Sequence, residues 1–298
     1  MGVKLPKEEV ELFFKLHPAL LAYANQRLKL VKNVSTADEF MRAPPEEKVR
    51  IRDALYNRMD LIDSFIDENP FNFSREELEI VLSWKHLLRG TFFVLQYLKN
   101  YTVFLDSEEP PKAYGVLALN DGFDELLGPY LPVTVKTVLL PFREKIIYDG
   151  LMNITHVIFG GGARRGLTDD FREAEHRFGI VTSLPYLGEE KEKSDAETLR
   201  FYLRSRSSRE KYGEEIAELI DKNPDILKVY HQETGKSDAR TYGRRLRELG
   251  LTGGWFAILE GVIIASGKTK EEVNGILDGI LSPEKRDFVH VFQLKGAS

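Results

Sequence analysis

Apolar residues recur every three or four positions through the first ninety residues, which is the spacing of amphipathic helices. The clearest run predicts a helix whose apolar face consists of Ile51, Leu55, Met59, Ile62 and Ile66. Ser74 and Glu77 match a capping box, in which each side chain accepts a backbone hydrogen bond, and predict a helix ending near Gly90. Pro18 lies within the first apolar stripe, and we expect it to break or kink that helix. Residues 1–90 are therefore predicted to form a helical N-terminal segment.

From residue 91 the pattern changes to that of strands. The segments TFFVLQYL, YTVFLDS and AYGVLALN are rich in aromatic and β-branched residues, and TVKTVLLPF, KIIYDGL and ITHVIFG follow them. Only Arg143 and Glu144 separate TVKTVLLPF from KIIYDGL, so we expect an antiparallel pair. Short helices are predicted at Asp121 to Leu127 and, after a glycine-rich turn, at Thr168 to Phe178. Residues 91–187 should form an antiparallel β-rich central domain.

The remaining residues predict two further parts. A charged stretch over residues 188–197 is typical of a linker or solvated loop, and with the helical pattern up to residue 250 it predicts a charged helical connector over 188–250. Over residues 251–298, WFAILEGVIIASG predicts a hairpin that turns at Glu260 and Gly261. Thr269 and Glu272 predict the start of a helix, and DFVHVFQL predicts a closing strand. This order is a small ββαβ module, and the fold class of the whole chain is α+β.

The composition excludes several classes of protein. The 298 residues carry a net charge of −5 at pH 7, which argues against a protein that coats nucleic acid with its whole surface but allows a local basic patch. There is no cysteine, which excludes thiolate catalysis, cysteine-bound metal and disulfides. The first residues are charged where a signal peptide needs an apolar core, and no apolar run reaches the ~18 residues of a membrane span. We expect a cytoplasmic protein without a membrane segment.

Six histidines show no metal-ligand spacing, so no metal site and no cofactor is expected. His156 and His290 fall within predicted strands and are interpreted as half-buried polar positions. Arg172 and His176 are four residues apart on a predicted helix, a spacing that could also build a phosphoryl-cleaving pair.

Several segments together resemble an uncharacterised prokaryotic family of unknown function. They are LIDSFIDENP (61–70), LKNYTVFL (98–105), YGVLAL (114–119), LPVTVKTVLLPFREKIIYDGL (131–151) and FGGGARRGL (159–167). The resemblance covers roughly residues 50–185 and implies a shared domain, but no activity. The pattern Trp-x-Ala-Ile…Gly-x-Ile-Ile-Ala-Ser-Gly near the C-terminus resembles small archaeal modules, also of unknown function.

A glycine- and arginine-rich segment is the first candidate site. Glycines let backbone amides approach an anion closely, and arginines bind phosphate bidentately. The predicted anion-binding residues are Gly160, Gly161, Gly162, Arg164 and Arg165. No known phosphate-loop spacing is present. The alternative is a sharp strand-to-helix turn in which the glycines adopt positive φ and the arginines are solvated.

A locally basic region between residues 200 and 247 is the second candidate site. Its predicted nucleic-acid contacts are Arg204, Arg206, Arg209, Arg240, Arg244 and Arg245, with Phe201 and Tyr202 available to stack on bases. The alternative is a salt-bridged helical face, because the region also contains acidic residues that could pair with those arginines at helical spacing: Glu210, Glu214, Glu215, Glu218 and Asp221. Ser237 is predicted to cap the helix that carries the later arginines.

Asp149 is the third candidate, because a carboxylate follows an apolar strand within the most specific part of the resemblance. It could act as a general base or ion ligand, or accept backbone hydrogen bonds that end the strand. No catalytic constellation can be recognised, so our first hypothesis is a non-enzymatic binding or adaptor protein that presents a sheet edge to a protein partner. The alternatives are a phosphate-ligand-binding enzyme or sensor using residues 159–166, and nucleic-acid binding through residues 200–247.

Overall fold

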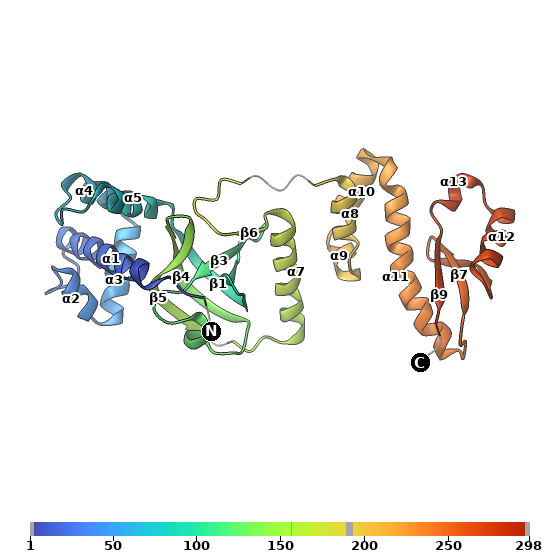
Figure 1. Ribbon diagram of the computed structural model, residues 1–298, viewed down its shortest axis with the longest axis horizontal. Helices are drawn as coiled ribbons and strands as arrows, with labels where there is room; N and C mark the ends of the chain where they lie inside the picture. The colour runs from blue at the N-terminus through green and yellow to red at the C-terminus, as the bar shows by residue number, and fades with distance from the viewer. Residues whose placement is uncertain (1–2, 156, 189–192, 296–298) are drawn as a thin grey trace. The chain divides into compact units, whose positions relative to one another are not determined.

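The computed structural model describes residues 3–155, 157–188 and 193–295. The chain divides into two compact units, unit 1 (Met1–Lys191) and unit 2 (Glu192–Ser298), and each is described by itself (Figure 1). Helices occur together with one mixed and one antiparallel sheet, which confirms the predicted α+β class. Among the described residues, no helix is both long enough and apolar enough to span a bilayer.

Unit 1 begins with a layer of helices. They are α1 (Lys7–Leu28), α2 (Ala37–Arg42), α3 (Pro45–Tyr56), α4 (Asp60–Glu68), α5 (Arg75–Ser83) and the 3₁₀ turn η1 (Trp84–His86). The predicted capping box is confirmed, because the Ser74 hydroxyl accepts from the Glu77 N–H and the Glu77 carboxylate accepts from the Ser74 N–H. The predicted break at Pro18 is wrong, since α1 continues through it. Every α1 residue from Leu16 to Asn25 is buried, and this packing outweighs one lost backbone hydrogen bond.

The strands that follow close into a barrel. They are β1 (Leu88–Tyr97), β2 (Thr102–Asp106), β3 (Ala113–Leu117), β4 (Val133–Phe142) and β5 (Lys145–Thr155), with α6 (Phe123–Leu127) between β3 and β4. β1 pairs with β2 and β4, β4 pairs with β5, and β2 pairs with β3, all antiparallel, as the sequence predicts for most of this domain. β5 pairs parallel with β3 and thereby closes the ring. This connectivity is that of an OB-type Greek-key barrel.

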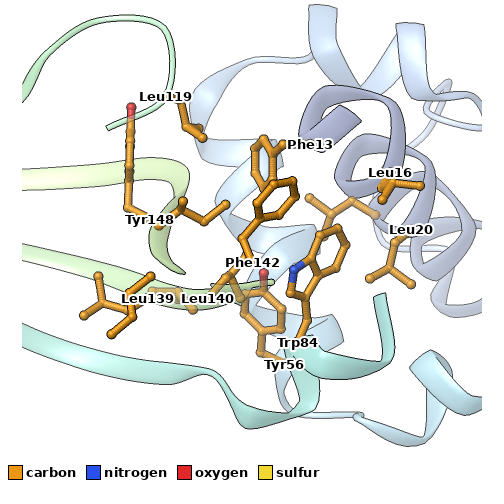
Figure 2. Close-up of a cluster of buried hydrophobic side chains, with 14 of the residues drawn as sticks. Phe13, Leu16, Leu20, Tyr56, Trp84, Leu119, Leu139, Leu140, Phe142 and Tyr148 are labelled. Atoms are coloured by element: carbon orange, nitrogen blue, oxygen red, sulfur yellow. The ribbon is translucent and has the colours of Figure 1, made fainter. Parts of the chain in front are cut away.

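One hydrophobic core joins the barrel to the helical layer. Inside the barrel, aromatic rings touch in sequence: Phe92 with Phe104, Phe104 with Phe123, and Phe123 with Tyr148. Figure 2 shows the core continuing between the strands and helices. There, Phe13 from α1 contacts the rings of both Trp84 and Phe142 edge-on. The helical layer is therefore fixed to the barrel by shared apolar burial.

The last helix of unit 1, α7 (Gly161–Arg177), covers the outer face of β1, β2 and β3, and β6 (Ile180–Val181) pairs parallel with β3 (Figure 1). Residues 161–167 were predicted to precede the helix, and instead they form its first turns. None of Gly160, Gly161, Gly162 and Gly166 has a positive φ, so the predicted role of these glycines in a strained turn is wrong. His156 lies outside the described residues.

Unit 2 begins with helices α8 (Asp195–Tyr202), α9 (Arg206–Lys211), α10 (Gly213–Lys222), the 3₁₀ turn η2 (Pro224–Ile226) and the long α11 (Leu227–Glu248). Residues 189–192 of the predicted linker lie outside the described residues, and helix α8 already begins within the last part of that linker. The predicted capping role of Ser237 is wrong, because Ser237 lies in the interior of α11, where its hydroxyl accepts from Arg209 at 3.0 Å.

The predicted ββαβ order in unit 2 is confirmed. The elements are β7 (Gly254–Leu259), β8 (Val262–Gly267), α12 (Lys270–Ile280), the short α13 (Pro283–Arg286) and β9 (His290–Leu294). The hairpin turns at Glu260 and Gly261, both with positive φ, and the strands have the order β8-β7-β9. Side chains alternate along β9: Val291 packs on the side of α12, whereas His290 approaches Gly235 of α11. Helices α11 and α12 thus cover opposite faces of the sheet (Figure 1).

Candidate functional sites

Asp149 lies in β5 next to an irregularity in the pairing of β4 with β5, and the following Gly150 has φ of +83°. Its side chain is completely buried. One carboxylate oxygen, Oδ1, accepts the Leu151 N–H at 3.1 Å, and the other, Oδ2, lies 3.4 Å from Nη1 of Arg52. The predicted backbone hydrogen bond is therefore present, but the prediction that it ends the strand is wrong, because β5 continues to Thr155. Burial raises the pKa of Asp149 to about 7, against the opposing effect of Arg52.

Charges alternate outward from Asp149 along helix α3 and strand β1. Arg52, with a side chain 9% exposed, also contacts Asp53 at 2.9 Å, and Asp53 in turn contacts Arg89 at 3.1 Å. Arg52 further donates to the Leu151 carbonyl at 3.4 Å. A buried charge whose partner is removed is costly to keep, so Arg52 and Asp149 depend on each other. Asp53 and Arg89 are partly exposed, and water compensates their charges in part. This series of ion pairs connects α3 to strands β5 and β1 of the barrel.

His17 and Tyr56 form a second buried polar contact beside Asp149. His17 Nε2 lies 2.9 Å from the Tyr56 hydroxyl, and the imidazole stacks on Phe13 with a centroid separation of 4.9 Å. Burial and, to a smaller extent, the positive charge of Arg52 lower the pKa of His17 to about 3. Burial also raises the pKa of Tyr56 well above its usual value. His17 is therefore neutral at physiological pH, although histidine is often the residue chosen for proton transfer.

A cavity of about 70 Å³ opens on these groups. His17, Lys48 and Asp149 supply its polar lining, and Phe13, Phe40 and neighbouring apolar residues supply the rest. Ligand pockets usually measure roughly 300–1,000 Å³, so this one suits a few water molecules better than a metabolite. Asp149 can exchange a proton near neutral pH here. The bonds of Asp149 to Arg52 and Leu151 otherwise explain how this carboxyl group is accommodated in the interior.

The predicted anion site forms the start of α7. Arg164 donates from Nε to the Phe159 carbonyl at 3.1 Å, and a Cβ added to Gly160, Gly161 or Gly162 would meet nothing within 4 Å. These glycines are therefore explained neither by a positive φ nor by close packing. Arg164 also lines an open cleft of about 270 Å³ between α7 and β1. The structure does not bring this segment and Asp149 into contact through any bond between described residues, and the anion site stays a prediction.

The arginines of the second candidate region fall into two groups. The first group has partners within unit 2: Arg204 stacks 3.8 Å from the centroid of the Phe201 ring, Arg206 pairs with Glu210 at 3.0 Å, and Arg209 donates to Ser237. These three side chains fit the alternative of an intramolecularly satisfied helical face.

The second group lies on the C-terminal half of α11 and is different. Arg240, Arg244 and Arg245 are exposed, and none of them forms an ion pair or hydrogen bond with any described side chain. Between residues 236 and 248 the chain has five cationic and two anionic side chains. Arg240, Arg244 and Arg247 follow the spacing i, i+4, i+7 and so share one side of the helix, which we call the arginine face, whereas Arg245 points elsewhere.

A groove of about 400 Å³ runs beside the arginine face, between α11 and β9. On the helix it is lined by Arg240 and Arg247 and by the small residues Ala239 and Gly243. On the strand side, its lining residues are Phe292, Gln293 and Leu294. Phe292 stacks on Phe256 with ring centroids 5.5 Å apart. The groove thus combines cations, small residues and an aromatic ring.

Among the described residues, no group of three or more His, Asp or Glu side chains is arranged to hold a metal ion. The outer strands of the unit 2 sheet are β8 and β9. Docking of a protein partner at one of these sheet edges stays a prediction. A comparison with family models, curated proteins and solved structures found no match for this chain. The resemblance of residues 50–185 to an uncharacterised family therefore also stays a prediction.

Sequence reasoning identified Asp149 but missed the residues that surround it. Arg52 and Tyr56 belong to an ordinary amphipathic pattern, and His17 gives no motif. One signal was available, since Arg52 lies directly beside Ile51 on the apolar side of its helix. A charged residue at such a position is a candidate for a buried ion pair. The groove depends on β9 lying beside α11, which no spacing within either element encodes.

Proposed function

We propose that this chain is a non-enzymatic binding protein whose unit 2 binds the phosphate backbone of a nucleic acid. The observation that carries the proposal is the arginine face, made of exposed arginines without a carboxylate partner among the described residues. Arginine is suited to phosphate because its planar guanidinium presents paired donors. In a chain with net charge −5, such a local concentration of unpaired cations favours an anionic ligand.

The spacing of the arginine face also supports a polymeric ligand. With a rise of ~1.5 Å per residue, Arg240 and Arg247 lie about 10 Å apart along the helix, with Arg244 between them. Arginines spread over this length can contact successive phosphates of one strand, which suits a polymeric ligand better than a single small anion. The barrel of unit 1 has a connectivity that often binds oligonucleotides on its β2–β3 face, but α7 covers that face here. We therefore assign the proposed binding to unit 2.

Salt dependence provides the test. If Arg240, Arg244 and Arg247 neutralise about three phosphates of a single strand, the logarithm of affinity should fall with the logarithm of salt with a slope of about −2. Replacing Arg240 and Arg244 together with Gln should make this slope shallower by about 1 to 1.5. Arg206→Gln is the matched control, because Arg206 is exposed but already paired with Glu210.

The measurement is fluorescence anisotropy of a labelled oligonucleotide with the full chain at a series of salt concentrations. Binding that does not respond to salt would contradict the proposal, as would equal losses in the Arg240/Arg244 and Arg206 variants. Circular dichroism of each variant checks that the fold is retained.

A further inference from the structure

We infer that the groove between α11 and β9 is a seat for one nucleotide of a single-stranded nucleic acid, with the phosphate between Arg240 and Arg247 and the base against Phe292. This inference rests on the proposed function and specifies the form of the ligand. Its starting point is the shape of the site: the arginine face borders a concave groove of about 400 Å³ rather than standing on an isolated convex helix.

The concave shape distinguishes a single strand from a duplex. In a duplex the bases are stacked inside and the phosphates lie on the outside of a wide cylinder, so a duplex can touch the rim of the groove but cannot fill it. In a single strand the base is free to leave the backbone and enter. A volume of about 400 Å³ lies within the usual range for a small organic ligand and accommodates one nucleotide.

The aromatic side of the groove supplies a surface for the base. Phe256 and Phe292 are opposite each other on β7 and β9, and their rings are nearly parallel, with 26° between the planes. Phe256 is buried, whereas Phe292 is partly exposed and lines the groove. A base lying on Phe292 would extend an existing stack. Stacking of this kind tolerates any base, so no strong sequence preference is expected.

The helical side leaves space that a side chain would otherwise fill. A Cβ added to Gly243 would lie 3.9 Å from both Leu294 and Arg247, which is ordinary contact and leaves the groove open beyond it. Glycine in a helix interior is less favourable than alanine by about 1 kcal/mol. Gly243 therefore keeps the groove open at a cost in helix stability, and a larger residue there should close the groove while helping the helix.

Two comparisons test the inference on the full chain. In the first, anisotropy compares a labelled ten-residue oligothymidylate with a duplex of the same length, and the single strand should bind at least tenfold more tightly. In the second, Gly243→Leu should reduce single-strand affinity about tenfold, close to the loss of one stacked base, while the melting temperature stays the same or rises. Phe292→Leu should reduce it similarly, and Arg206→Gln should leave it unchanged.

The outcomes separate this inference from the proposed function. Equal or tighter binding of the duplex would overturn the single-strand seat and leave nucleic-acid binding by the arginine face in place. Unchanged affinity in Gly243→Leu would also overturn the seat, because the groove would then not be occupied. Absence of binding to either oligonucleotide would overturn both the seat and the proposed function.

Discussion

Replacing Asp149 with Asn should change how the stability of unit 1 depends on pH. Two effects act on this carboxylate in opposite directions: burial favours the neutral acid, and Arg52 favours the carboxylate. Burial is the larger effect, and the pKa is raised from 3.8 to about 7. The folded protein therefore binds a proton that the unfolded chain has released between these two pH values. Asp149 should make folding less favourable as pH rises through this range.

The magnitude follows from the size of the pKa shift. One pKa unit corresponds to about 1.4 kcal/mol, so the contribution of Asp149 should fall by about 1.4 kcal/mol per pH unit within this window. Between about pH 4.5 and about pH 6.5 the difference in unfolding free energy between wild type and Asp149→Asn should change by about 3 kcal/mol. The unfolding free energy of the wild type should fall relative to that of the variant as pH rises.

His17 should produce the opposite dependence. Its pKa is lowered from 6.5 to about 3, so the unfolded chain binds the extra proton and stability falls as pH falls through this range. Between about pH 4 and about pH 6.5 the two contributions nearly cancel. His17→Gln should therefore expose the slope of Asp149, and Asp149→Asn should expose the slope of His17.

The assay is urea unfolding at a series of pH values, followed by tryptophan fluorescence. The chain has two tryptophans, and Trp255→Phe leaves Trp84, buried in the core of unit 1, as the reporter. All other carboxylates cancel in the difference between wild type and Asp149→Asn. A difference that does not change with pH would refute the reasoning, because the pKa of Asp149 would then be the same in both states. A change of the opposite sign would mean that Arg52 outweighs burial.

Two further predictions concern a close backbone contact in unit 2 and the buried ion pair in unit 1. Gly235→Ala should destabilise unit 2 by at least about 2 kcal/mol, since the added Cβ would lie 2.4 Å from Cβ of His290. Gly243→Ala, in the same helix but with ordinary contacts, should stabilise unit 2 by up to about 1 kcal/mol. Thermal unfolding of both variants measures these changes, and equal effects would contradict the prediction. Removing the Arg52 charge should raise the pKa of Asp149 further above 7, so the loss of stability in Arg52→Met should grow by up to about 1.4 kcal/mol for each pH unit above pH 7. Urea unfolding at neutral and at alkaline pH measures this growth, which should disappear in the Arg52→Met/Asp149→Asn double variant; a loss that grows equally in the double variant would mean that the pair is not coupled.

Local patterns predicted those parts of the fold that depend on neighbouring residues. The capping box at Ser74 and the hairpin at Glu260 involve groups a few residues apart, and both are present. Pro18 shows the limit of such rules, because the burial of α1 overrides the preference of one residue. Barrel closure depends on β3 meeting β5 from about thirty residues away, which no local spacing specifies.

The candidate sites were predictable to different degrees for the same reason. Asp149 stands out in sequence as a carboxylate after an apolar strand, but its partner Arg52 is 97 residues away. The arginines of residues 200–247 differ in the same way. The pair of Arg206 with Glu210 follows the i,i+4 spacing that the sequence shows, whereas the bond of Arg209 to Ser237 joins residues 28 positions apart. Only the structure shows that Arg240 and Arg244 have no such partner among the described residues.

The salt dependence of single-strand binding tests the central claim most directly. Anisotropy titrations of the full chain with a labelled oligothymidylate should give a logarithmic slope of about −2 for the wild type and for Arg206→Gln. The slope should become shallower by about 1 to 1.5 when Arg240 and Arg244 are both replaced by Gln. Identical slopes in all three proteins, or no binding at low salt, would contradict the assignment of the arginine face to a nucleic acid.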